Sequence, residues 1–102
     1  LSVSGVNANI FLSGMNIDTA FMASSGFSLQ NGFTSGTYSE CELKREVLKR
    51  ASKVIMLMDS SKVGKSLPYT FGSLEDIDVL ITDGMLDEDI ATAASAAGTE
   101  IQ

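Results

Sequence analysis

Two pairs of charged side chains, together with a loop rich in hydroxyl groups, could carry chemistry in this sequence. Glu40 and Lys44 lie four residues apart, and Asp59 and Lys62 directly follow an apolar run. Lysine ammonium groups and loop amides suit a phosphate group, whereas carboxylates suit the hydroxyl groups of a sugar. A carboxylate beside a lysine could also promote enolisation of an aldose or ketose phosphate. These residue types support either a binding site for a small phosphorylated polyol or an isomerase, and composition does not separate the two.

Several other kinds of site conflict with the composition. The chain has no His and one Cys, which excludes a Ser-His-Asp triad and argues against a zinc site, so we expect no metal. Gly64-Lys65-Ser66 resembles the end of a P-loop, but Asp59 holds the place of the first glycine, so we reject that motif. We expect no cofactor. The single Cys41 excludes an internal disulfide and fits a reducing compartment, so we expect a cytoplasmic protein.

Length and charge limit the partners that this chain can bind. The 102 residues suggest one domain or part of one. The net charge is −6 and the pI is about 4.3, whereas nucleic-acid binders usually carry a basic patch, so we expect this chain to bind DNA poorly by itself. No apolar run approaches the ~20 residues that span a bilayer, and the first residues do not form a signal peptide.

The positions of the polar side chains follow from two apolar runs that read as buried strands. Val54–Met58 contains no polar residue, which is typical of a central parallel strand that is covered on both faces. Residues 77–81 repeat the design and end in Thr82-Asp83, and residues 19–24 form a third expected strand that ends in Ser24-Ser25. Ligands bind at the carboxyl ends of parallel strands, so we expect these polar tips to converge on one edge of the sheet.

Two helices alternate with these strands, over residues 38–52 and 87–97, which predicts an α/β fold with a parallel sheet. Glu40 and Lys44 fall inside the apolar stripe of the first helix. They could therefore line a cleft, or they could form an ordinary i,i+4 ion pair at the start of a helix. We read residues 27–37 as a loop, which could cradle an anion or simply turn the chain.

Shorter elements complete the expected organisation. Residues 6–16 are spaced as an amphipathic helix, and residues 69–71 as an extended segment. Ser73 is expected to cap a helical turn over residues 73–76, and Gly98 to end the second helix. A last strand is expected to start at Thr99.

Four motifs together resemble the effector domain of DeoR-type transcriptional repressors over roughly residues 18–102. The motifs are Gly32-Phe33-Thr34, Glu40-x-x-x-Lys44-Arg45, Leu57-Met58-Asp59-Ser60-Ser61-Lys62 and Asp76-Ile77-Asp78-x-x-Ile81-Thr82-Asp83. The resemblance implies a Rossmann-like sensor domain related to ribose-5-phosphate isomerase and the coenzyme A transferases. It implies that a phosphorylated sugar or related metabolite binds here, and that DNA is bound only by a separate N-terminal helix-turn-helix module.

The family pattern favours one set of effector-binding residues. The members are Glu40, Lys44, Asp59 and Lys62, followed by Ser25, Gly26 and Thr34. The isomerase's general-base glutamate falls on Lys44 when the Asp59–Lys62 motif is matched, and its glycine-rich lysine motif is not matched. We therefore expect a binding domain without catalysis, with a sugar-phosphate isomerase as the alternative.

The resemblance also predicts how this chain relates to a larger protein. The chain lacks an initiator Met, so we expect residues 1–102 to be part of a single effector-binding domain. The upstream segment of that domain and the DNA-binding module would lie before Leu1. Strand edges left open by the missing segment favour pairing with another chain, so we expect a homo-oligomer.

Overall fold

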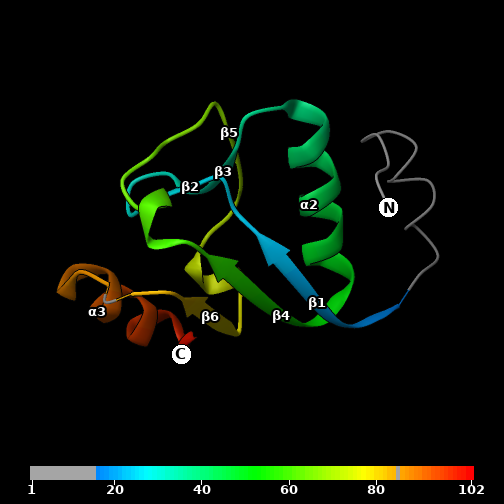
Figure 1. Ribbon diagram of the computed structural model, residues 1–102. Coiled ribbons are helices and arrows are strands. Elements are labelled where there is room, and N and C mark those ends of the chain that lie inside the picture. Colours follow the sequence, from blue (N-terminus) through cyan, green and yellow to red (C-terminus); the bar gives the residue numbers. More distant parts are fainter. Residues whose placement is uncertain (1–15, 85) are drawn as a thin grey trace.

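Four parallel strands form the main sheet in the order β1-β4-β6-β7 (Figure 1). The structure, a computed structural model, describes residues 16–84 and 86–102. The strands are β1 (Ile17–Ala23), β4 (Ala51–Met58), β6 (Val79–Thr82) and β7 (Glu100–Ile101). Helices connect β1 to β4 and β6 to β7, as expected of parallel neighbours. The predicted α/β class, with a parallel sheet flanked by helices, is confirmed.

The first described helix, α2 (Tyr38–Arg50), is stabilised at its start by a capping side chain and at both ends by charged residues. Thr37 is the N-cap, and its Oγ1 accepts a hydrogen bond of 3.3 Å from the backbone N–H of Glu40. Glu40 lies in the first turn and two basic residues lie in the last, which suits the helix dipole. The predicted helix over residues 38–52 is confirmed except for its last two residues, which begin β4. The helix predicted over residues 6–16 lies largely outside the described residues.

A second, antiparallel sheet contains β2 (Gly26–Ser28), β3 (Gly32–Ser35) and β5 (Tyr69–Gly72) in the order β2-β3-β5. The prediction of a loop over residues 27–37 is therefore wrong, because most of these residues form a hairpin. Phe27 and Phe33 pair across the two strands with ring centroids 4.7 Å apart, and both side chains are buried. Burial of these rings stabilises a hairpin that the polar composition of the segment hides.

Two short 3₁₀ helices lie between β4 and α3 (Glu88–Ala97), in the connections that also contain β5 and β6. These helices are η1 (Ser60–Lys62) and η2 (Leu74–Asp76). Ser73 and Asp76 form a capping box at η2, and Gly98 ends α3 with φ 82°, so both predicted caps are confirmed. The extended segment expected near Tyr69 is β5, and the last expected strand is β7.

The core lies between one face of the main sheet, the two helices and the small sheet. It is formed by alternate residues of the main strands and by apolar residues of the connections, including Ala20, Met22, Val54, Met56, Met58, Leu80, Cys41, Ile90 and Phe33. On the other face, Leu57 is 43% exposed and Ile55 is half-buried. The prediction that both faces of Val54–Met58 are covered is therefore wrong for the described residues.

Asp78, directly before β6, stabilises the main sheet through a hydrogen bond between its side chain and the backbone of β4. Its Oδ2 accepts a hydrogen bond of 2.7 Å from the N–H of Val54, which is buried. Asp78→Ala is expected to lower the free energy of unfolding by about 1–2 kcal/mol, because a buried donor then loses its partner. Urea unfolding followed by circular dichroism measures this loss. Asp18→Ala, on exposed β1 surface, is the control, and equal losses in the two variants would contradict this role of Asp78.

Candidate functional site at the carboxyl edge of the parallel sheet

Three neighbouring parallel strands end at the same edge of the main sheet. Ala23 of β1 pairs with Leu57 of β4, which pairs with Ile81 of β6. Neighbouring strands lie about 4.8 Å apart, so the residues that follow each strand are neighbours in space. The arrowheads of β1 and β4 point toward the small sheet in Figure 1. This edge is where polar strand ends were predicted to converge.

Lys44 points inward from α2 and meets the end of β1. Its Nζ donates a hydrogen bond of 2.6 Å to the carbonyl oxygen of Ala23 and lies 3.0 Å from Oε1 of Glu40. It also lies 4.8 Å from the centroid of the Phe71 ring. The Lys44 side chain is 16% exposed, compared with 43% for Glu40. An ordinary surface ion pair does not have this geometry, because the ammonium group is fixed against the strand end by three kinds of contact.

Asp59 and Asp83 organise the backbone that follows β4. Oδ1 of Asp59 accepts a hydrogen bond of 3.0 Å from the N–H of Ser61, so Asp59 caps η1. Oδ1 of Asp83 accepts a hydrogen bond of 2.8 Å from the N–H of Ser60. The backbone and side-chain hydrogen bonds from Ser60 lower the pKa of Asp83 below its usual value. Both carboxyl groups therefore hold the loop after β4 in place from neighbouring strand ends.

A hollow of about 410 Å³ lies at the ends of β4 and β6. Its lining residues are Leu57, Met58, Asp59, Ile81, Thr82 and Asp83. Oγ1 of Thr82 is buried and has no hydrogen-bond partner in the part of the chain that the structure describes. The two carboxylates at this hollow can accept hydrogen bonds from the hydroxyl groups of a polyol.

Lys62 extends the polar edge beyond this hollow. It lies in η1 and is half-buried. Within residues 16–84 and 86–102, no salt bridge involves Lys62 or Asp59, so the ammonium group of Lys62 has no bound carboxylate. No hydrogen bond or salt bridge in this part joins the Glu40–Lys44 pair to Asp59 or Lys62. A single cluster of all four side chains therefore stays a prediction.

The three remaining predicted residues lie where the small sheet meets the edge. Thr34 is fully buried, and its Oγ1 accepts a hydrogen bond of 3.0 Å from the N–H of Leu67. Gly26 leaves no room for a side chain, because a Cβ there would lie 2.6 Å from the carbonyl oxygen of Lys65. Ser25 is half-buried between β1 and β2. Thr34 and Gly26 thus have clear packing roles, and contact of the three residues with an effector stays a prediction.

A larger hollow of about 510 Å³ lies elsewhere, between the small sheet, η2 and α3. Its polar lining includes Asn31, Arg45, Ser73 and Asp76. None of the seven predicted residues lines it. Arg45 is already engaged there, since its Nη2 donates a hydrogen bond of 2.6 Å to the carbonyl oxygen of Thr70. Its larger size therefore does not make this hollow the better candidate, because the strand ends lie elsewhere.

Comparison with known families identifies the kind of domain that carries this edge. A family model of the DeoR C-terminal sensor domain matches residues 1–84. The chain belongs to this family. The resemblance inferred from the four motifs is therefore confirmed, and so is the assignment of the fold to this family. None of the helices in the described part of this sensor domain is long and apolar enough to cross a membrane.

Relatives of the sensor domain are transcriptional regulators. The chain is 33% identical over 97 residues to the HTH-type transcriptional regulator GlpR of Haloferax volcanii, covering 95% of this chain and 38% of the relative. It is 29% identical over 101 residues to GolR of Listeria innocua, covering 99% and 40%. It is 32% identical over 88 residues to IolR of Bacillus subtilis, covering 86% and 35%. The chain thus spans roughly two fifths or less of these relatives.

Two residues that the sequence analysis placed at this edge, but not among its seven effector-binding candidates, contribute to the site. Asp83 and Thr82 line the hollow with Asp59. The sequence did contain a signal for them, because β6 repeats the order of β4, in which an apolar strand ends in a polar tip. The hydrogen bond from Ser60 to Asp83 was not predictable, since it depends on the pairing of β4 with β6.

The lowered pKa of Asp83 predicts how stability depends on pH. Since the folded state holds this pKa below the unfolded value of about 3.9, ionised Asp83 stabilises the fold at neutral pH, and this contribution is lost as the pH falls through the folded-state pKa. Asp83→Asn is expected to weaken the fall in stability between pH 6 and pH 3, measured by urea unfolding at each pH. Asp87→Asn is the control, and a fall in Asp83→Asn as steep as in the unmodified chain would contradict the prediction.

Proposed function

We propose that this chain is the effector-sensing domain of a bacterial transcriptional regulator, and that it binds a phosphorylated sugar or related metabolite at the carboxyl edge of the main sheet. The observation that carries the proposal is the fixed position of Lys44 at the end of β1, one strand away from Asp59 at the end of β4. The two strands are neighbours in the sheet, which supports a site that combines a cation with hydrogen-bond acceptors. A phosphorylated polyol needs both.

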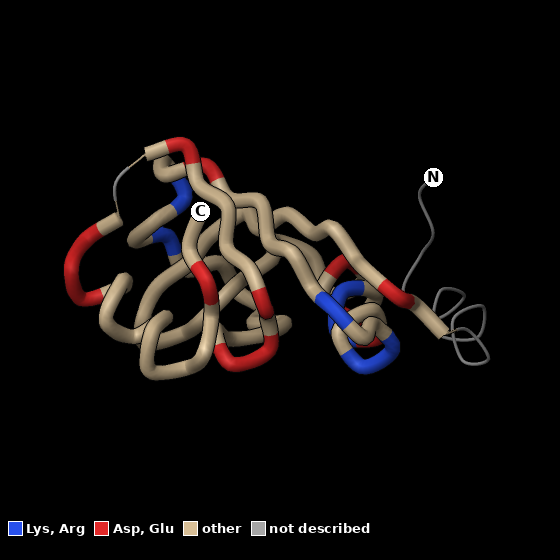
Figure 2. The backbone as a smooth tube through the Cα atoms, turned by 90° about the horizontal axis from the view of Figure 1, so that it is seen from below, with Lys and Arg blue, Asp and Glu red and all other residues tan. Residues whose placement is uncertain are grey.

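The charge distribution supports a division of the site into two halves. Basic residues gather on α2 and in the segment after β4, in a chain with a net charge of −6 (Figure 2). Lys44 and Lys62 would bind the phosphate group. Asp59 and Asp83 would bind sugar hydroxyl groups in the hollow at the ends of β4 and β6.

The contacts of Lys44 favour a sensor domain that binds its effector without catalysis. Its ammonium group is held by Glu40 and by the carbonyl oxygen of Ala23, so Glu40 is already paired with a cation and Lys44 cannot act as a carboxylate base. The relatives are named as transcriptional regulators, which agrees with a binding role. In the complete protein, effector binding would shift a conformational or oligomeric equilibrium and so change the affinity of a separate helix-turn-helix module for its operator.

Thermal-shift screening of the complete protein against a panel of sugar phosphates tests the proposal. At least one sugar phosphate is expected to raise the melting temperature, whereas the matching free sugar raises it less. Lys62→Ala is expected to weaken binding by about tenfold or more, since it removes a charged partner of the phosphate. Lys49→Ala, an exposed position on α2, is the matched control. The absence of any stabilising sugar phosphate, or equal affinity of the two variants, would contradict the proposal.

A further inference from the structure

The ammonium group of Lys44 is fully engaged by groups of the chain itself. Its Nζ donates a hydrogen bond of 2.6 Å to the carbonyl oxygen of Ala23, lies 3.0 Å from Oε1 of Glu40, and lies 4.8 Å from the centroid of the Phe71 ring. An ammonium group has three N–H donors, and three partners are enough to engage all of them. A phosphate group that binds Lys44 must therefore replace one of these partners.

Glu40 is the partner that can leave without disturbing the fold. The carbonyl oxygen of Ala23 is fixed by the pairing of β1 with β4, and the Phe71 side chain is buried. The Glu40 side chain, by contrast, is 43% exposed. Its backbone N–H is bound to Oγ1 of Thr37 whether or not the ion pair forms, and a free carboxylate in the first turn of α2 still suits the helix dipole.

We propose that Glu40 competes with the phosphate group of the effector for Lys44, and that effector binding exchanges one anion for the other. The inference rests on the proposed function, because it takes Lys44 as a phosphate-binding residue. A phosphate monoester carries a charge of about −1.5 to −2 at pH 7, so it can displace a single carboxylate from the ammonium group. The displaced Glu40 side chain turns toward solvent, while Lys44 keeps its contacts with Ala23 and Phe71.

This exchange gives Glu40 two opposing effects on the sensor. The Lys44 side chain is only 16% exposed, and a cation in such a position is costly unless an opposite charge lies beside it. Glu40 supplies that charge whenever no phosphate is bound. The same ion pair lowers the affinity for phosphate, since only molecules in which the pair is open can bind it. Glu40 therefore raises the effector concentration at which the domain responds.

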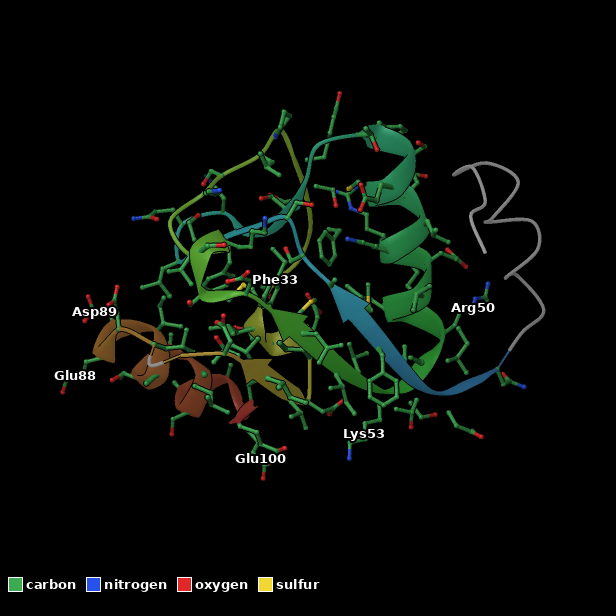
Figure 3. All side chains as sticks on the ribbon, in the orientation of Figure 1. Phe33, Arg50, Lys53, Glu88, Asp89 and Glu100 are labelled. Atoms are coloured by element: carbon green, nitrogen blue, oxygen red, sulfur yellow. The ribbon has the colours of Figure 1, made fainter. Side chains whose placement is uncertain are left out.

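Titration of the complete protein with inorganic phosphate, at constant ionic strength, tests this role of Glu40. Nuclear magnetic resonance follows the amide resonance of Lys44. Glu40→Gln preserves the size of the side chain and removes its charge, so it is expected to lower the Kd of phosphate by about threefold or more. Glu46→Gln is the matched control and should leave the Kd nearly unchanged. It removes the same charge from α2, but Glu46 pairs with Arg50, which lies at the end of α2 remote from the arrowheads of β1 and β4 (Figure 3).

A double-mutant cycle separates competition for Lys44 from a general effect of charge. Lys44→Met keeps an unbranched apolar side chain and removes the ammonium group. In this background Glu40→Gln should no longer tighten phosphate binding, because no ion pair remains to be opened. Circular dichroism verifies that each variant is folded.

Three results would overturn the inference. Equal or weaker phosphate binding by Glu40→Gln would mean that Glu40 does not compete, and weaker binding would show that it contacts the ligand or holds Lys44 in place. An equal gain in the Lys44→Met background would assign the effect to net charge alone. The absence of any phosphate-dependent shift at Lys44, in the unmodified protein and in Glu40→Gln, would remove Lys44 from the phosphate site. The thermal-shift screen with sugar phosphates tests the proposed function separately.

Discussion

Replacement of Phe33 by alanine is expected to lower the free energy of unfolding by about 3–5 kcal/mol. The Phe33 side chain is 0% exposed. Its ring lies 4.7 Å from that of Phe27 and 6.2 Å from that of Phe71, measured between centroids. The ring thus joins all three strands of the small sheet, and its loss leaves a cavity that rigid strands cannot close.

Urea unfolding followed by far-ultraviolet circular dichroism measures the Phe33→Ala loss. Small domains have only about 5–15 kcal/mol of stability. The variant should therefore unfold at a urea concentration well below the midpoint concentration of the unmodified chain. Phe21→Ala is the matched control, because Phe21 is 68% exposed. A Phe33→Ala loss below about 1 kcal/mol would mean that the small sheet contributes little to the fold.

Gly32→Ala is expected to lower the free energy of unfolding by about 2–4 kcal/mol. The loss combines strain in the backbone conformation with a steric clash of the new Cβ. Gly32 has φ 73°, a left-handed conformation that the turn before β3 requires. A Cβ at this position would also clash with the carbonyl oxygen of Gly72, a backbone atom that cannot shift without moving β5. The substitution should therefore separate β3 from β5.

Two other glycines separate the penalties in the same measurement. Gly64 has φ 87° but open space where a Cβ would lie, so Gly64→Ala should cost only about 1–2 kcal/mol from the backbone conformation. Gly36 has neither constraint, so Gly36→Ala should be neutral or slightly stabilising. Equal losses in the Gly32 and Gly64 variants would show that close approach to Gly72 is unimportant.

Elements with strong local signals were predictable from the sequence. β4 and β6 are marked by apolar runs, and α3 by acids in its first turn and a terminal glycine. The β2–β3 hairpin was not predictable, because Phe27 and Phe33 are isolated among turn residues and only their pairing reveals the strands. The exposure of Leu57 was not predicted either, since an unbroken apolar run predicts cover on both faces of a strand.

The candidate site was predictable in its location but not in its contacts. The carboxyl ends of β1, β4 and β6 follow from strand order and parallel direction, and the polar tips were visible in the sequence. The inward position of Lys44 follows from the helical stripe, but its bond to Ala23 depends on how α2 packs on β1. Whether Lys62 joins Lys44 around one ligand depends on the effector itself.

Nuclear magnetic resonance mapping of effector binding in the complete protein tests the central claim most directly. A stabilising sugar phosphate is titrated while the backbone amide resonances are followed. The largest shifts are expected at the ends of the three strands, at residues 24–25, 59–62 and 82–84, and at Lys44. Shifts centred on Asn31, Ser73 and Asp76, which line the larger hollow, would contradict the account.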